Sequence, residues 1–209
     1  MSGPDKQVDF RWQVPTRVRK NAGMSEEIEA AAAASGNEYH RVAGESILLI
    51  ALPELDQHVL PWGLATAPDG ITTHVTVLTP FLPETEIDEG VLAELRGIFG
   101  GVAAHDLTFA KVGRFPTVLY LVPDPDQPVR DMIAALWARW PQCPPYGGAF
   151  DDPAPHLSVV RDATEAGFEE AAGILETRLP LRSRAAAVDL LIFDGSRWNL
   201  RERFPLAGT

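Results

Sequence analysis

Residues 74–79 read HVTVLT and residues 156–160 read HLSVV, and the two stretches share a four-residue frame. Each frame consists of a histidine, an apolar residue, a hydroxyl residue and a second apolar residue. The chain has only 5 histidines, so two of them in the same frame suggest a repeated element. On a β-strand, side chains at positions i and i+2 emerge on one face, which places each histidine beside its own hydroxyl residue.

The residues around the two histidine frames predict strands and helices in a repeated order. An apolar run at 46–53 predicts a buried strand before the first frame, followed by a short helix at 54–62. After the first frame come an amphipathic helix over 85–99, a strand hairpin over 106–123 and a helix over 126–140. After the second frame come a helix over 163–179 and two strands that turn near 194–196. This order indicates an internal duplication.

Two such strands side by side around a pseudo-twofold axis would bring two imidazoles and two hydroxyls to one cleft. An imidazole with a pKa near 6.5 can act as acid or base at neutral pH. Cleavage of a phosphodiester needs both: a base for the attacking oxygen and an acid for the leaving oxygen. We therefore predict four catalytic residues, namely His74, Thr76, His156 and Ser158. His156 is assigned as base and His74 as acid, and the symmetry leaves the reverse assignment open.

The hydroxyls of Thr76 and Ser158 can donate hydrogen bonds to the non-bridging phosphate oxygens. This chemistry needs no metal and no cofactor, so neither is expected. A single frame would be read as an ordinary strand residue, and the second frame is what favours catalysis.

Five further residues are predicted to contact the substrate. Three aromatic residues lie on segments that could flank the cleft and stack on a base, with packing as an equal alternative: Phe115, Tyr146 and Phe150. Arg161 follows Ser158 by three positions, which is the opposite face of an ideal strand, but it could reach phosphate if the strand ends at residue 160. Arg114 lies at the hairpin tip, from which it could reach the cleft mouth.

The net charge of −11 argues against broad binding to nucleic acid, because such binding needs a dense basic surface. A small nucleotide or an RNA terminus remains possible as substrate, since a focused positive pocket can exist on an acidic protein. No apolar run is long enough for a membrane span, and no secretory signal is visible. We expect a cytoplasmic monomer without membrane contact.

The chain divides into two parts. Residues 1–44 are predicted to be a partly flexible N-terminal extension with one short helix, and residues 45–209 to be a two-lobed domain. Cys143 is the only cysteine and therefore cannot form an internal disulfide. The lack of a GxxxxGK[ST] loop in the sequence argues against a nucleoside-triphosphate enzyme.

The region from about Ser46 to Leu206 resembles the two-histidine (2H) phosphoesterase superfamily, and within it the bacterial 2'-5' RNA ligase-like proteins. Four segments carry the resemblance: THVTVLTPFLP (73–83), VGRFPTVLYLVP (112–123), PPYGGAFDDPAPHLSVV (144–160) and SRWNLRERFPL (196–206). It implies a bilobal α+β fold, in which two antiparallel sheets face a central cleft and helices lie outside. It also implies activity on 2',3'-cyclic phosphates or 2'-5' linkages.

The leading prediction is a metal-independent phosphodiesterase that acts on a cyclic phosphate or a 2'-5' linkage of a nucleotide or RNA end. One alternative is an RNA ligase that joins ends through a 2'-5' bond, with the same histidines working in reverse. The other is a nucleotide- or phosphate-binding module that performs no chemistry.

Overall fold

The computed structural model describes residues 41–59, 70–150 and 152–208, so the predicted extension lies outside it except for residues 41–44. The first half contains β1 (Ser46–Ala51), η1 (Pro53–Leu55), α2 (Asp56–Val59), β2 (His74–Leu78), η3 (Glu84–Glu86), α3 (Glu89–Gly100), β3 (His105–Phe115) and β4 (Val118–Asp124). The second half contains α4 (Gln127–Arg139), η4 (Pro145–Gly148), β5 (Leu157–Arg161), α5 (Glu165–Glu176), β6 (Leu181–Ala185), β7 (Ala187–Phe193) and β8 (Trp198–Pro205).

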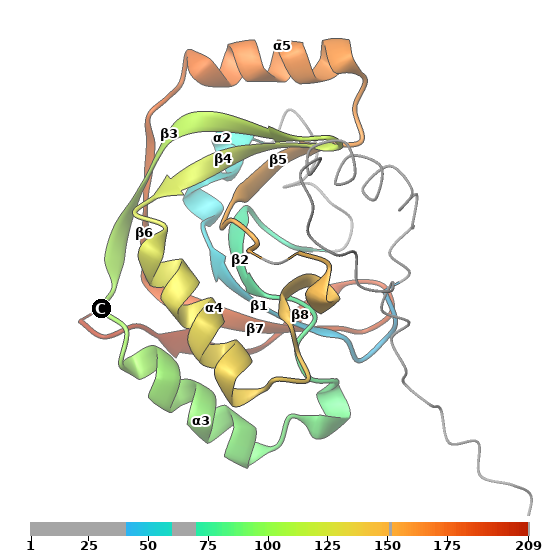
Figure 1. The fold of residues 1–209 in the computed structure, drawn as a ribbon, viewed down its shortest axis with the longest axis vertical. Coiled ribbons are helices and arrows are strands. Elements are labelled where there is room, and N and C mark those ends of the chain that lie inside the picture. The colour runs from blue at the N-terminus through green and yellow to red at the C-terminus, as the bar shows by residue number, and fades with distance from the viewer. Residues whose placement is uncertain (1–40, 60–69, 151, 209) are drawn as a thin grey trace, which may run out of the picture.

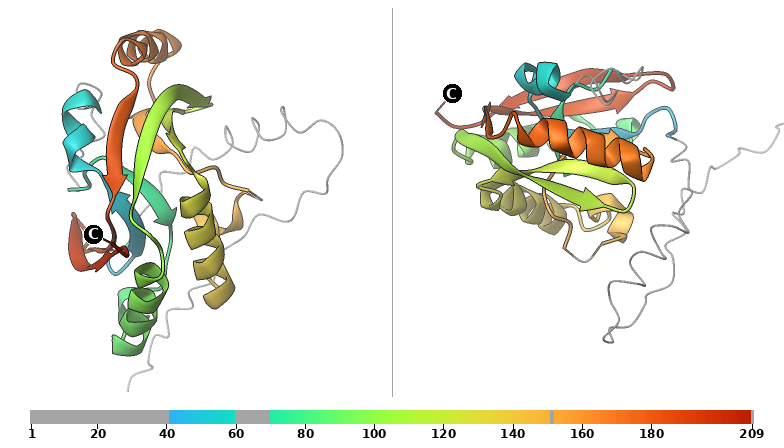
Figure 2. Two further views of the ribbon diagram at one scale, coloured as in Figure 1. Left: turned by 90° about the vertical axis from the view of Figure 1, so that its left-hand side faces the viewer. Right: turned by 90° about the horizontal axis from the view of Figure 1, so that it is seen from above.

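The strands form two four-stranded antiparallel sheets. The first sheet has the order β2-β1-β7-β8, and the second has the order β5-β4-β3-β6. Helices α3 and α4 lie along the first sheet, and α5 lies across the far side of the second (Figure 1). The two lobes are seen from two further directions in Figure 2. The α+β fold with two antiparallel sheets is thus confirmed.

The two strands that carry the histidine frames are edge strands, and they contact each other. β2 is the edge of the first sheet and β5 is the edge of the second. They lie side by side where the two sheets meet (Figure 1). The topology therefore brings together two segments that are far apart in the sequence.

The prediction of two strands after α5 is wrong, because the structure has three. β6 pairs with β3 in the second sheet, whereas β7 and β8 return to the first sheet. Only Ala186 separates β6 from β7. The stretch contains no glycine, proline or asparagine, so the sequence gives no signal that the chain passes from one sheet to the other.

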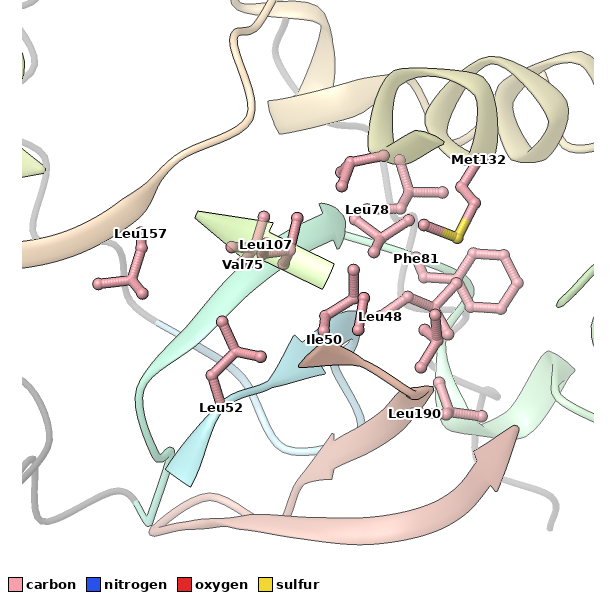
Figure 3. Close-up of a cluster of buried hydrophobic side chains, with 14 of the residues drawn as sticks. Leu48, Ile50, Leu52, Val75, Leu78, Phe81, Leu107, Met132, Leu157 and Leu190 are labelled. Atoms are coloured by element: carbon pink, nitrogen blue, oxygen red, sulfur yellow. The ribbon is translucent and has the colours of Figure 1, made fainter. Parts of the chain in front are cut away.

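One hydrophobic core joins the two sheets. It includes Leu48 and Ile50 of the first sheet and Leu107 and Leu157 of the second, all completely buried (Figure 3). Met132 of α4 packs into the same cluster. Each fully buried side chain of this kind stabilises the fold by about 1.5–3 kcal/mol.

Two of the helices, α3 and α5, begin at side-chain caps. The Asp88 side chain accepts a hydrogen bond from the Val91 amide at the start of α3, and Thr164 does the same for the Gly167 amide at the start of α5. The described helices include none that is both long enough and apolar enough to cross a membrane.

Candidate active site

The two frame histidines are oriented by the same local hydrogen bond. The His74 Nδ1 lies 2.7 Å from the Thr72 carbonyl oxygen, and the His156 Nδ1 lies 2.9 Å from the Ala154 carbonyl oxygen. A carbonyl can only accept, so Nδ1 carries the proton in each neutral ring. Nε2 is then the nitrogen that can exchange a proton with a ligand.

His105 makes the same type of bond, with its Nδ1 at 3.0 Å from the Ala103 carbonyl oxygen. Two positions further on stands the buried Leu107 rather than a hydroxyl residue. This hydrogen bond from Nδ1 to a backbone carbonyl therefore orients a histidine ring, but it does not by itself indicate an active site. What distinguishes the frame histidines is the hydroxyl residue beside each of them.

A β-bulge follows the hydroxyl residue in both frames. Opposite β1, the register shifts so that Thr76 pairs with Leu49 and Leu78 pairs with Leu48. Val77 is the extra residue, and Val77 and Leu78 are both buried. A bulge places two residues against one on the partner strand, so two successive side chains can enter the core.

The second frame has its bulge at the same position. Ser158 pairs with Tyr120 and Val160 pairs with Leu119, which leaves Val159 as the extra residue. Val159 and Val160 are both buried, at 0% and 5% exposure. The repeat thus extends from four residues to six: histidine, apolar, hydroxyl, two inward apolar residues, and then Thr79 or Arg161.

The second bulge decides the position of Arg161. Directly paired residues of neighbouring antiparallel strands share a face, and Arg161 pairs with Val118 just as Ser158 pairs with Tyr120. Val118 and Tyr120 are two apart, so Arg161 and Ser158 lie on the same face. The Arg161 Nη2 donates a hydrogen bond to the Ser158 Oγ at 3.2 Å. The expectation from an ideal strand, that Arg161 faces away, is wrong because of the bulge.

Three aromatic rings surround the His156 imidazole. Phe115 and Tyr120 approach it edge-on, with centroid distances of 5.2 Å and 5.4 Å. Tyr146 lies nearly parallel to it, at 6.4 Å and an interplanar angle of 18°. Of these three, the sequence predicted Phe115 and Tyr146 but missed Tyr120.

Tyr120 occupies its position because residue 113 is a glycine. The two residues are direct partners across the hairpin. A Cβ atom on Gly113 would lie only 2.3 Å from the Cζ atom of Tyr120, so only glycine leaves room for this ring. Tyr120 also stacks on Phe115 with a centroid distance of 4.2 Å. A glycine inside a predicted strand, opposite an aromatic residue, is the signal that could have revealed Tyr120.

Tyr146 connects the two frames. Its backbone amide donates a hydrogen bond to the Thr79 carbonyl at 2.7 Å, directly after β2. Its ring meanwhile stacks beside His156, directly before β5. Tyr146 has a positive φ of 52°, a conformation uncommon for residues other than glycine. The loop before β5 is therefore held against the end of β2.

Burial among these rings lowers the pKa of His156 below its ordinary value of 6.5. Desolvation is the largest cause, because the charged imidazolium is less stable away from water. The bond to the Ala154 carbonyl acts in the opposite direction, and the nearby Arg161 charge adds to the lowering. His156 is consequently neutral at pH 7, as a general base must be.

The two remaining predicted substrate contacts, Arg114 and Phe150, make other interactions. Arg114 is turned toward α5, where its Nη2 lies 3.0 Å from a Glu165 carboxylate oxygen and its guanidinium lies 3.3 Å from the Phe168 ring centroid. It is adjacent in sequence to Gly113 and so lies on the opposite face of the sheet from Tyr120. Phe150 is 52% exposed and meets Tyr146 edge-on at 5.7 Å. The structure thus gives Arg114 partners on α5 and leaves the Phe150 ring half exposed beside Tyr146.

Metal-ligand side chains are not clustered in the described ranges, where no group of three or more histidine, cysteine, aspartate or glutamate residues could hold an ion.

Comparison with known proteins gives one family and one fold. Residues 66–197 match the family model described as the 2'-5' RNA ligase superfamily. No curated protein matches the chain. Among solved structures, E. coli LigT in its apo form has 19% sequence identity and a TM-score of 0.53, covering 80% of this chain and 99% of LigT.

Two further structures share the fold. E. coli LigT complexed with 3'-AMP has 19% identity and a TM-score of 0.51, with 79% of this chain and 99% of that chain covered. TT0787 of Thermus thermophilus has 16% identity and a TM-score of 0.51, with 78% and 98% covered. At these identities, the likeness establishes the bilobal architecture.

Proposed function

The chain belongs to the 2'-5' RNA ligase superfamily, within the 2H phosphoesterases, and on this basis we propose that it is a phosphodiesterase acting on 2',3'-cyclic phosphate or 2'-5' linkages. The substrate is a nucleotide or an RNA end, and the catalysts are a pair of histidines. One observation carries the proposal: two contacting edge strands each present a histidine, a hydroxyl and the same bulge.

The two histidines take opposite protonation states. His156 is neutral because its pKa is lowered, so its Nε2 removes a proton from the attacking water. The water oxygen bonds to phosphorus, and one bond from phosphorus to a ribose oxygen breaks. His74, protonated at Nε2, gives its proton to that ribose oxygen. The product is a phosphate monoester, and the two histidines exchange their protonation states over one turnover.

Thr76, Ser158 and Arg161 stabilise the charge that develops on the phosphate. The two hydroxyls lie beside their histidines and donate to non-bridging oxygens. Arg161 shares the face of Ser158 and bonds to its Oγ, which places a cation at the same oxygens. A hydrogen bond from a charged donor is about twice as strong as one from a neutral donor. A hydrogen bond from the Arg161 guanidinium to the phosphate therefore stabilises the transition state more than one from a hydroxyl.

The aromatic rings favour a nucleoside phosphate over other phosphodiesters. The rings of Phe115 and Tyr146 lie beside His156, where they can stack on a nucleotide base of any kind. LigT, which shares this fold, has been crystallised with 3'-AMP, a nucleoside monophosphate. That complex supports a small nucleotide as ligand here.

RNA ligation is the second candidate, and the family name favours it. The same base and acid would join two ends if the 5'-hydroxyl of a second RNA end, in place of water, attacked the cyclic phosphate, while the bond from phosphorus to the ribose 3'-oxygen breaks and that oxygen takes a proton. We rank hydrolysis first because the net charge of −11 opposes the capture of two RNA strands. RNA affinity that falls steeply with salt would favour ligation. Turnover of a cyclic mononucleotide without RNA affinity would favour hydrolysis.

The test is turnover of 2',3'-cyclic nucleotides by purified protein in excess chelator. We expect hydrolysis, and we expect His74→Ala and His156→Ala each to lower kcat by about 10²–10⁴-fold, because each removes one proton-transfer group. The matched control is His105→Ala, which removes the third histidine with an Nδ1-to-carbonyl bond and should retain activity.

Absence of turnover in the unaltered protein, or turnover that survives both frame substitutions, would reject the proposal. Binding of a cyclic nucleotide that raises the melting temperature without hydrolysis would indicate a binding module.

A further inference from the structure

The face of the first sheet that carries His74 and Thr76, its catalytic face, also carries a small apolar cluster. The cluster consists of Ile47, Leu49, Ile71, Phe193 and Trp198. Leu49 is the direct partner of Thr76 across β1 and β2, and directly paired residues share a face. Trp198 is the direct partner of Phe193 at the start of β8. The sheet surface beside the Thr76 hydroxyl is therefore apolar and aromatic.

Arg41 lies over this cluster. Its guanidinium carbon is 5.5 Å from the centroid of the Trp198 ring, within the range of a cation–π interaction. Arg41 precedes β1, and the chain between them is bonded to the end of β7. The Gly44 amide donates to the Phe193 carbonyl, and the Phe193 amide donates to the Glu45 carbonyl, each at 2.8 Å. These contacts place the Arg41 guanidinium against the catalytic face of the first sheet.

The charge of Arg41 reaches Arg161 at the end of β5, in the other lobe. Desolvation is the largest cause that lowers the pKa of Arg161, and the like charge of Arg41 lowers it further, whereas Tyr146 and Asp162 raise it. Arg161 itself donates a hydrogen bond to the Ser158 Oγ at 3.2 Å. The two arginines therefore approach each other from the two lobes, beside a predicted catalytic hydroxyl.

This pair of arginines suits an anion. Repulsion between the two like charges is relieved when a negative group lies between them. The chain as a whole is acidic, with a net charge of −11, so the pair makes a local positive field of the kind that attracts an anion to an acidic protein. Guanidinium groups match phosphate in particular, because their N–H donors are arranged in a planar fork.

We propose that Arg41 is a second arginine of the phosphate site, which binds the reacting phosphate together with Arg161. The inference rests on the proposed function, because it takes the reacting phosphate to lie at Ser158. Arg41 and Trp198 both lie outside residues 66–197, the segment that matches the superfamily, so the family match does not include this contact.

Arg41 acts mainly on the doubly charged form of the phosphate. The cyclic phosphodiester carries one negative charge. Water that has lost its proton to His156 adds a second charge as its oxygen bonds to phosphorus. The bond to the ribose oxygen then breaks, His74 protonates that oxygen, and the phosphate monoester keeps close to two charges at pH 7. A second guanidinium therefore stabilises the transition state and the product more than the substrate.

The experiment compares the unaltered protein with Arg41→Ala and Arg41→Lys. Single-turnover hydrolysis of adenosine 2',3'-cyclic phosphate by excess protein gives the rate of the chemical step and the affinity for the substrate separately. Arg41→Ala should lower this rate about tenfold and the substrate affinity by less than about threefold, because the lost interaction is made mainly in the transition state.

The second measurement is the Kd of adenosine 3'-phosphate by titration calorimetry, which involves no turnover. Arg41→Ala should weaken binding about tenfold, which corresponds to about 1.4 kcal/mol. Arg41→Lys keeps the charge but loses the fork, so it should recover part of the rate and of the affinity.

Arg139→Ala is the matched control. Arg139 also lies over a tryptophan ring, with its guanidinium carbon 5.1 Å from the Trp140 centroid, and it pairs with Glu94 at the surface of α3 and α4. The substitution removes the same charge and the same type of ring contact. The rate and both affinities should stay as in the unaltered protein.

An adenosine 3'-phosphate affinity that is unmeasurable in the unaltered protein or unchanged in Arg41→Ala would overturn the proposal. An equal loss in Arg139→Ala, or no recovery in Arg41→Lys, would also overturn it. Weaker binding in Arg41→Ala without any turnover of the cyclic nucleotide would instead retain the arginine contact and reject the proposed reaction. Turnover with a rate and a product affinity that do not depend on Arg41 would do the reverse.

Discussion

The environment of the His156 imidazole sets the acidic limit of the pH range in which the proposed reaction can run. Desolvation by Phe115, Tyr120 and Tyr146 lowers the pKa of His156. We therefore predict that the acidic limb of kcat/KM against pH has its midpoint below 6.5, the ordinary value. The profile of kcat/KM reports the free enzyme, in which this environment is defined.

The sign of the effect on stability follows from the same shift. Between the lowered pKa and 6.5, the unfolded chain binds a proton that the folded chain does not bind. Acidification through this range therefore destabilises the fold, and the His156 contribution is complete above 6.5. An acidic limb above pH 6.5 would contradict the assignment of His156 as base.

The individual residues also show what the sequence could predict at the site. The four residues of the two frames were predicted from spacing alone, since strand alternation gives each histidine a hydroxyl neighbour. Tyr120 was missed because its position depends on the missing side chain of Gly113, on another strand. Arg114 was predicted near the cleft because a hairpin tip does not reveal which face its residue takes, and here it takes the α5 face.

At the scale of the element, the alternation of apolar and polar residues along the sequence did not predict the bulge in β5. A regular strand would bury either Val159 or Val160, whereas the bulged strand buries both. The consecutive apolar pairs Val77-Leu78 and Val159-Val160 were visible in the sequence. They are also compatible with a fully buried strand, so the pattern alone did not require a bulge.

The bulge predicts the outcome of two conservative substitutions. Val159→Thr and Val160→Thr each place a hydroxyl in the core, and each should lower the free energy of unfolding by about 1–3 kcal/mol. Val42→Thr, at a position with 45% exposure, is the control and should have little effect. Urea denaturation measures all three. A neutral result for either core substitution would indicate a regular strand in place of the bulge.

At the scale of the whole molecule, the shared core makes the two lobes one cooperative unit. Ile50 lies in the first sheet and Leu121 in the second, and both belong to the same buried cluster. We predict that Ile50→Ala and Leu121→Ala each cost about 2–5 kcal/mol and shift the same single thermal transition. Calorimetry would show this. Two transitions, each responding to only one substitution, would mean that the lobes unfold separately.

Leu200→Ala provides the comparison for this experiment, because Leu200 is 55% exposed and its truncation should leave the transition almost unchanged.

The sequence predicted the α+β class and the presence of two sheets. It could not predict how the last strands divide between them, because β6 and β7 are nearly continuous in sequence and the division depends on long-range pairing.

The division of the strands between the two sheets affects the order in which they can pair as the protein is synthesised. All four strands of the second sheet lie in one continuous segment from His105 to Ala185, so they can pair as soon as that segment has left the ribosome. In the first sheet, β1 can pair with β2 soon after both are made, but β7, its neighbour on the other side, is made much later. Because pairing over such a distance is slow, β1 is late in gaining its second partner, β7. Until then, the apolar strand β1 has one unpaired edge that a chaperone could shield.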